Sequence, residues 1–189
     1  MNRFPLAAWL IITASPLRAD PFCDDLWFAR NQLFDRAGYC FSSPLGQAVF
    51  DNSDCTGKDI TLEPGGAEMV AEIRASEARV PCDVDTSRTW LEIENIALRR
   101  RLGQVVYRSE FASGCLGWNG GPLTLLAGPG PTSEPIAMVE TGDDIVWEYD
   151  SLPWPEGWTF ISVYRDGVQT GLGWRRDDID HALCTGLAG

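Results

Sequence analysis

Six cysteines constrain the fold of this chain more than any other feature of its sequence. An even number of cysteines in an exported protein predicts a disulfide framework, here of three bonds. A zinc site is the alternative, but the sequence has no Cys-x-x-Cys or Cys-x-x-His spacing, and its single imidazole is that of His181. We therefore expect disulfides, no metal site and no cofactor. The cysteines are Cys23, Cys40, Cys55, Cys82, Cys115 and Cys184.

The first nineteen residues have the pattern of a secretory signal. Arg3 supplies a positive charge, and residues 4–14 form an apolar run that is too short to span a bilayer. The small side chain of Ala19 marks the expected cleavage site, so that the mature chain begins at Asp20. We expect a protein of the periplasm or a secreted protein, with no membrane insertion after cleavage.

Acidic residues outnumber basic ones, because 27 Asp and Glu against 15 Lys and Arg give a net charge of −12. Nucleic acids and anionic membranes bind to cationic faces, so we expect neither as a partner. Arg99, Arg100 and Arg101 form a basic run. In a chain this acidic, the run is expected to be a solvated turn that pairs with nearby carboxylates rather than a phosphate clamp.

Residues 20–82 are predicted to form a small helical domain. Capping residues, prolines and apolar residues at helical spacing divide this stretch into three helices. The expected starts are Asp24 or Asp25, then Ser43 with Pro44, then Pro64; the first helix should end at Gly38 and the third before Pro81.

The first helix carries a family resemblance. Its run from Leu26 to Tyr39 resembles the YARHG domain, over about residues 25–58. The naming motif falls on residues 34–38, where Asp35 and Ala37 replace the usual Ala and His. The resemblance implies an extracellular bacterial module, and it brings no established molecular function.

Residues 83–114 connect this domain to the rest of the chain and give a mixed signal. Residues 91–94 alternate as in a strand, which favours a hairpin that turns at residues 99–103. A helical face formed by Leu91, Asn95, Leu98 and Leu102 is the alternative.

Short β-type segments separated by Gly and Pro fill the last third of the chain. Asp166-Gly167 is a strong hairpin turn between the fourth and fifth segments. Five short strands without an intervening amphipathic helix predict a small barrel, so the fold class is α+β. The predicted strands are residues 123–127, 136–140, 144–149, 158–164 and 172–175.

The order of motifs in residues 115–189 resembles the bacterial SH3 domain. The matching motifs begin at Leu123, Thr141, Gly157 and Gly171, while Leu126 replaces an Arg that is common in the first of them. The resemblance implies an SH3-like β-barrel that binds peptides or cell-wall stems through aromatic residues on its loops. The whole arrangement is similar to an uncharacterised family of secreted proteins from alphaproteobacteria.

Aromatic residues around the loop at residues 150–156 are the candidate ligand contacts. Trp154 stands between Pro153 and Pro155, and a rigid exposed Trp is a common binding anchor. Trp158 and Trp174 lie in strand motifs, which favours a core position. The candidate binding residues are Trp154, Tyr149, Trp158 and Tyr164.

The predicted folds suggest how the cysteines pair. The first and last strands of an SH3-like barrel are neighbours, so the resemblance implies a bond between Cys115 and Cys184. A helix of about twelve residues between Cys23 and Cys40 would separate them by roughly 18 Å, which excludes that pair. Two choices remain: Cys23 with Cys55 and Cys40 with Cys82, which we favour, or Cys40 with Cys55 and Cys23 with Cys82.

The sequence offers few candidate catalytic residues. Six paired cysteines leave no thiolate, and no Gly-x-Ser-x-Gly or His-Glu-x-x-His motif is present. We expect a non-enzymatic binding or adaptor protein of the bacterial cell envelope, which recognises a peptide, protein or cell-wall ligand. A hydrolase that uses Asp and Glu carboxylates is the alternative.

Overall fold

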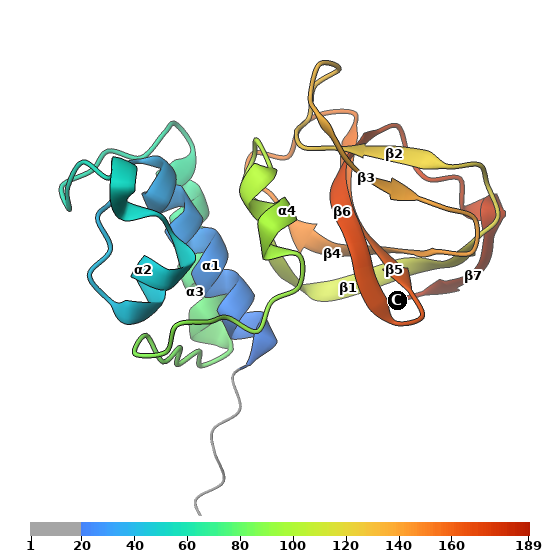
Figure 1. Ribbon diagram of the computed structural model, residues 1–189. Coiled ribbons are helices and arrows are strands. Elements are labelled where there is room, and N and C mark those ends of the chain that lie inside the picture. The colour runs from blue at the N-terminus through green and yellow to red at the C-terminus, as the bar shows by residue number, and fades with distance from the viewer. Residues whose placement is uncertain (1–19) are drawn as a thin grey trace, which may run out of the picture.

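The computed structural model describes residues 20–189 of an α+β protein, so the predicted signal segment 1–19 lies outside the described residues. Helices α1–α3 form one side of the molecule, an antiparallel sheet forms the other, and α4 lies between them (Figure 1). None of the helices in residues 20–189 is long and apolar enough to cross a membrane. The helices are α1 (Pro21–Arg36), α2 (Pro44–Val49), α3 (Gly66–Arg79) and α4 (Ile96–Arg101), with 3-10 turns at Asn52–Asp54 and His181–Leu183.

Helix α1 begins one turn earlier than Asp24 or Asp25. The side chain of Asp20 caps it by accepting a hydrogen bond of 3.0 Å from the Phe22 backbone N–H. Asp24 and Asp25 are instead almost completely buried and point into the protein. The sequence misplaced this start because three acidic residues compete for one cap, and only burial decides between them.

The other helix boundaries follow their local signals. Ser43 caps α2 by accepting from the Gly46 N–H at 3.1 Å, with Pro44 in the first turn as predicted. Helix α3 begins at Gly66, two residues after Pro64, and ends before Pro81 as predicted. These signals are local, so the sequence alone locates them.

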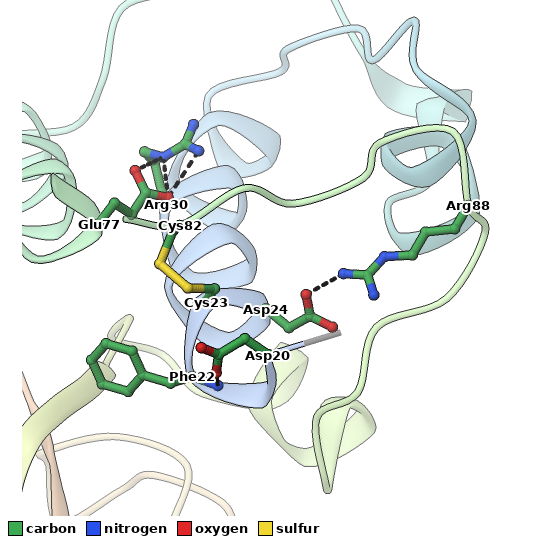
Figure 2. Close-up of a disulfide and its surroundings, with 8 residues drawn as sticks. All are labelled: Asp20, Phe22, Cys23, Asp24, Arg30, Glu77, Cys82 and Arg88. Atoms are coloured by element: carbon green, nitrogen blue, oxygen red, sulfur yellow. Dashed lines mark hydrogen bonds and ion pairs between the residues drawn. A yellow bond between two sulfur atoms is a disulfide. The ribbon is translucent and has the colours of Figure 1, made fainter. Parts of the chain in front are cut away.

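The favoured pairing of the N-terminal cysteines is wrong, and the alternative holds. Cys23 bonds Cys82, because α3 packs on α1 and brings the residues that follow α3 to the start of α1 (Figure 2). Arg30 and Glu77 join the same two helices with hydrogen bonds of 3.0 and 3.1 Å.

Cys40 bonds Cys55 because α2 is only six residues long. It is too short to return the chain to Cys23, and the chain turns back onto residues 38–40 instead. The Cys40 N–H donates to the Gly57 carbonyl at 2.7 Å, and the Thr56 N–H donates to the Gly38 carbonyl at 2.7 Å.

The sheet has seven antiparallel strands in the order β3-β2-β6-β5-β4-β1-β7. All five predicted strands are present as β2 to β6, and Asp166 and Gly167 form the predicted hairpin turn, both with positive φ. The strands are β1 (Tyr107–Trp118), β2 (Leu123–Leu126), β3 (Pro135–Val139), β4 (Asp144–Asp150), β5 (Trp158–Arg165), β6 (Val168–Arg176) and β7 (Cys184–Ala188).

The sheet curls but does not close, so the expectation of a closed SH3-like barrel is not confirmed. Strands β3 and β7 are its two edges. Leu125 of β2 and Val139 of β3 share a core with Cys115 and Trp118 of β1, although these strands are not neighbours in the sheet. The curl, which Figure 1 shows, therefore encloses a core, while the edge strands β3 and β7 do not pair. The predicted bond between Cys115 and Cys184 is confirmed, and it joins β1 to β7.

The predicted hairpin at residues 99–103 is wrong, because residues 96–101 form α4. The helical alternative is closer, since Leu98 and Leu102 pack against the core of the sheet. Val105, just after α4, shares a core cluster with Leu26 of α1 and Ile73 of α3. The helices and the sheet are thus joined by continuous apolar packing.

Candidate functional site

A cleft of about 460 Å³ lies where the helical side of the molecule meets the sheet. A second, adjoining cleft of about 800 Å³ shares Trp90 and Glu92 with it, so the two meet along the segment at residues 90–92. Such volumes suit a small molecule or a few residues of a peptide. The first cleft is lined by Pro21, Asp25, residues 90–94, Arg108, Tyr149, Tyr164 and Gln169.

A buried ion pair supports the floor of the first cleft. Arg99 of α4 donates to Asp25 of α1 at 2.6 and 3.3 Å, and also to the Val106 carbonyl at 2.8 Å. The Tyr149 hydroxyl donates to the same Asp25 carboxylate at 3.2 Å. Burial alone would lower the pKa of Arg99, but Asp25 and Tyr149 raise it above its ordinary value. Arg99 is completely buried, so the expectation of a solvated arginine turn is wrong at this position.

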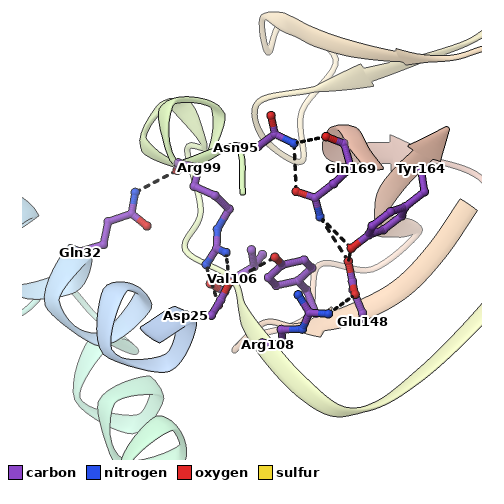
Figure 3. A network of polar contacts seen from close by, with 10 residues as sticks. Asp25, Gln32, Asn95, Arg99, Val106, Arg108, Glu148, Tyr164 and Gln169 are labelled. Atoms are coloured by element: carbon purple, nitrogen blue, oxygen red, sulfur yellow. Dashed lines mark hydrogen bonds and ion pairs between the residues drawn. The ribbon is translucent and has the colours of Figure 1, made fainter. Parts of the chain in front are cut away.

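A second polar group forms the sheet side of the cleft. Glu148, also buried, accepts from Arg108 at 2.7 Å and from the Tyr164 hydroxyl at 2.8 Å. Burial and this carboxylate raise the pKa of Tyr164 to about 12. Gln169 donates to Glu148 at 3.3 Å and accepts from Asn95 at 3.1 Å, so the group reaches the residue that precedes α4 (Figure 3). The sheet side of the cleft is therefore held by polar contacts among four strands, β1, β4, β5 and β6.

Residues 90–93 form the opposite wall and belong to no helix or strand. The Glu92 N–H donates to the Asp24 carboxylate at 2.7 Å, and Arg88 forms an ion pair with the same carboxylate (Figure 2). Within residues 20–189, the other backbone groups of residues 90–93 make no hydrogen bond to the protein. This wall thus presents unpaired N–H and C=O groups beside Trp90, whose exposed fraction is 56 %.

The four predicted binding residues lie in two places. Tyr149 and Tyr164 line the first cleft, although Tyr149 is buried and burial raises its pKa. Trp154 and Trp158 line a separate pocket of about 590 Å³. Trp154 is 44 % exposed, and its indole N–H donates to the Trp158 carbonyl at 3.0 Å. Its ring also lies 5.6 Å from that of the buried Trp174, so Trp154 covers the core as well as facing solvent.

Apart from Tyr149 and Tyr164, the residues that build the cleft were not predicted from the sequence. Trp90, Arg108, Glu148 and Gln169 come from four separate segments, so no motif joins them. One signal was available for Trp90, since a large aromatic residue stands there among acidic residues in a stretch without regular periodicity. The position of Trp90 beside a cleft follows only from the tertiary fold.

The buried carboxylates in the described part of the chain share one feature, which is an arginine partner. Each pair has its N···O contact within salt-bridge distance, and each carboxylate is nearly inaccessible to solvent. The pairs are Asp24 with Arg88, Asp25 with Arg99, Asp143 with Arg165 and Glu148 with Arg108. Each of these carboxylates is therefore already occupied as a hydrogen-bond acceptor of an arginine side chain.

Two family models match this chain. One is described as a domain of unknown function (DUF4453) and matches residues 81–189; the other is the YARHG domain and matches residues 6–78. The resemblance of the first helix to the YARHG domain is thereby confirmed. No curated protein and no solved structure matches the chain. The three disulfides together with the YARHG domain indicate an extracellular or periplasmic protein, and they fit an exported binding protein.

Proposed function

The chain belongs to the DUF4453 family, whose description assigns no activity, and we therefore propose a function from the geometry: it is an exported binding protein that holds a short peptide segment in the cleft between α1 and the sheet. The observation that carries this proposal is the wall at residues 90–93. Its unpaired backbone groups can hydrogen-bond the main chain of a ligand, as the edge of a sheet does when it takes up an extended peptide.

The aromatic residues of the cleft supply apolar contact area. Trp90 is more exposed than any other Trp in residues 20–189, and Tyr164 faces the same cleft across from it. Rings of this kind anchor ligands because they bury a large area at a small entropic cost. The polar floor is already paired within the protein, so it can fix the shape of the cleft without a ligand.

The arginine partners of the buried carboxylates support binding over hydrolysis. A hydrolase that uses two carboxylates needs one of them protonated at neutral pH, which calls for a raised pKa. Hydrogen bonds from Arg165 and the Glu140 N–H lower the pKa of Asp143 in spite of its burial. Asp25 and Glu148, which lie at the cleft, each accept from an arginine at 2.6 or 2.7 Å.

The test compares the two exposed tryptophans. The oxidised chain is incubated with an array of acetyl-capped hexapeptides of varied sequence, and affinities for the bound members are then measured in solution. Trp90→Ala should weaken binding about thirtyfold, which corresponds to loss of a typical aromatic anchor. Trp154→Ala is the matched control and should change affinity less than threefold. The opposite result would move the site to the Trp154 pocket and overturn the proposal.

A further inference from the structure

The ring of Trp90 already contacts one cationic side chain, that of Arg88, in the free protein. The guanidinium carbon of Arg88 lies 5.2 Å from the centroid of the Trp90 ring, which is within the distance of a cation–π contact. Arg88 is held there by its ion pair with the buried Asp24, and its Nε is buried without a hydrogen-bond partner. Trp90 as a whole nevertheless remains 56 % exposed, so Arg88 leaves much of this residue open to solvent.

The second cleft, which adjoins the first at Trp90 and Glu92, is acidic around this ring. Five of the ten residues that line it are carboxylates, and Arg88 is its one basic residue. Asp20 caps α1, Asp24 holds Arg88, and hydrogen bonds from Ser87 lower the pKa of Asp85. Within residues 20–189, the Asp83 and Glu92 carboxylates make no hydrogen bond or ion pair. Two charges beside the exposed ring are thus left for a ligand.

We propose that Trp90 binds a cationic side chain of the bound peptide, an arginine or a lysine. This inference rests on the proposed function, since it names the class of peptide that the cleft takes. The ligand cation lies against the part of the ring that Arg88 leaves open and faces Asp83 and Glu92, while Arg88 stays paired with Asp24. A cation is attracted by both the ring and the carboxylates, whereas a neutral side chain gains only the apolar contact.

Two probe peptides test this inference. One is acetyl-Ala-Ala-Arg-Ala-Ala-amide, and the other carries citrulline, a neutral side chain of nearly the same shape, in place of Arg. Binding to the oxidised chain is measured by isothermal titration calorimetry, which serves the Trp90 variants equally well. The arginine peptide should bind about tenfold more tightly than the citrulline peptide, and this preference should shrink as salt is added.

Variants locate the preference. Asp83→Asn combined with Glu92→Gln should reduce it to less than threefold. Because neither carboxylate makes a hydrogen bond or an ion pair in residues 20–189, the fold should be unaffected. Trp90→Phe should keep most of the preference, and Trp90→Leu should lower it to the part that the carboxylates supply. Asp178→Asn, which changes an acidic residue in the Trp154 pocket, is the matched control and should have no effect.

The outcomes separate this inference from the proposed function. If both peptides bind equally and Trp90→Ala weakens both, the cleft binds peptides but Trp90 does not select a cationic side chain. Only this inference is then overturned. If neither peptide binds, or if Trp90→Ala changes neither affinity, both proposals are overturned.

Discussion

Arg99 and Asp25, which are 74 residues apart in the sequence, form an ion pair of 2.6 Å in which the arginine is completely buried and the carboxylate nearly so. The pair joins α4 to α1, and Tyr149 extends it to β4. The apolar cluster around Val105 joins the helical side to the sheet as well, so the two sides are expected to unfold together.

Removing Arg99 alone should therefore be severe. Arg99→Met leaves the Asp25 carboxylate buried without its partner, which costs about 3–5 kcal/mol of unfolding free energy. Urea denaturation followed by circular dichroism measures this loss. The control is Arg101→Met, which breaks the exposed pair with Glu134 and should change stability by less than about 1 kcal/mol. Equal effects of the two substitutions would contradict the structural role of the buried pair.

The disulfides should differ in their contributions to stability according to the loops that they close. Cys40 and Cys55 are separated by 15 residues, and Cys115 and Cys184 by 69. In the chain-entropy model, loss of the first bond by paired Cys→Ser substitution costs about 3 kcal/mol and loss of the second about 4 kcal/mol. Peptide mapping without reduction checks the pairing itself. A peptide that joins Cys23 to Cys55 would refute it.

Tyr164 should make the unfolding free energy depend on pH in the alkaline range. Burial and the Glu148 carboxylate raise the pKa of Tyr164 in the folded state to about 12, above its ordinary value of 10.0. The folded state therefore holds this proton more tightly than the unfolded state, so the contribution is complete below pH 10 and disappears as the pH rises toward 12.

Two variants isolate this effect. Tyr164→Phe has no hydroxyl to titrate. Its unfolding free energy should therefore fall less between pH 10 and 12 than that of the unsubstituted protein. Glu148→Gln should bring the phenol pKa, followed by ultraviolet absorbance, back toward 10. A titration of Tyr164 that is unchanged in Glu148→Gln would contradict the hydrogen bond between these residues.

The elements with local signals could be predicted from the sequence. Ser43 with Pro44 starts α2, and Asp166 with Gly167 turns β5 into β6, because cap and turn chemistry involve residues that are close in the chain. Strand β1 was missed because a register shift between Arg108 and Ser113 interrupts its alternation, and five of its twelve residues are exposed.

The cleft could not be predicted in the same way. The burial of Arg99 depends on Asp25, and the pairing of Cys23 with Cys82 depends on how α3 packs on α1. Trp90 gains its neighbours only when residues 20–25, 83–92 and the face of the sheet come together. Such contacts between distant segments are set by tertiary packing, which neither spacing nor composition reveals.

Amide hydrogen exchange tests the central claim, which is that a peptide hydrogen-bonds to the wall of the cleft. The oxidised chain is measured with and without a saturating hexapeptide taken from the array, and exchange is followed at individual amides. Exchange should be slower with the peptide bound at Leu91 and Ile93, whose N–H groups are unpaired in the free protein. Protection that is confined to the loop around Trp154, with residues 90–93 unchanged, would contradict it.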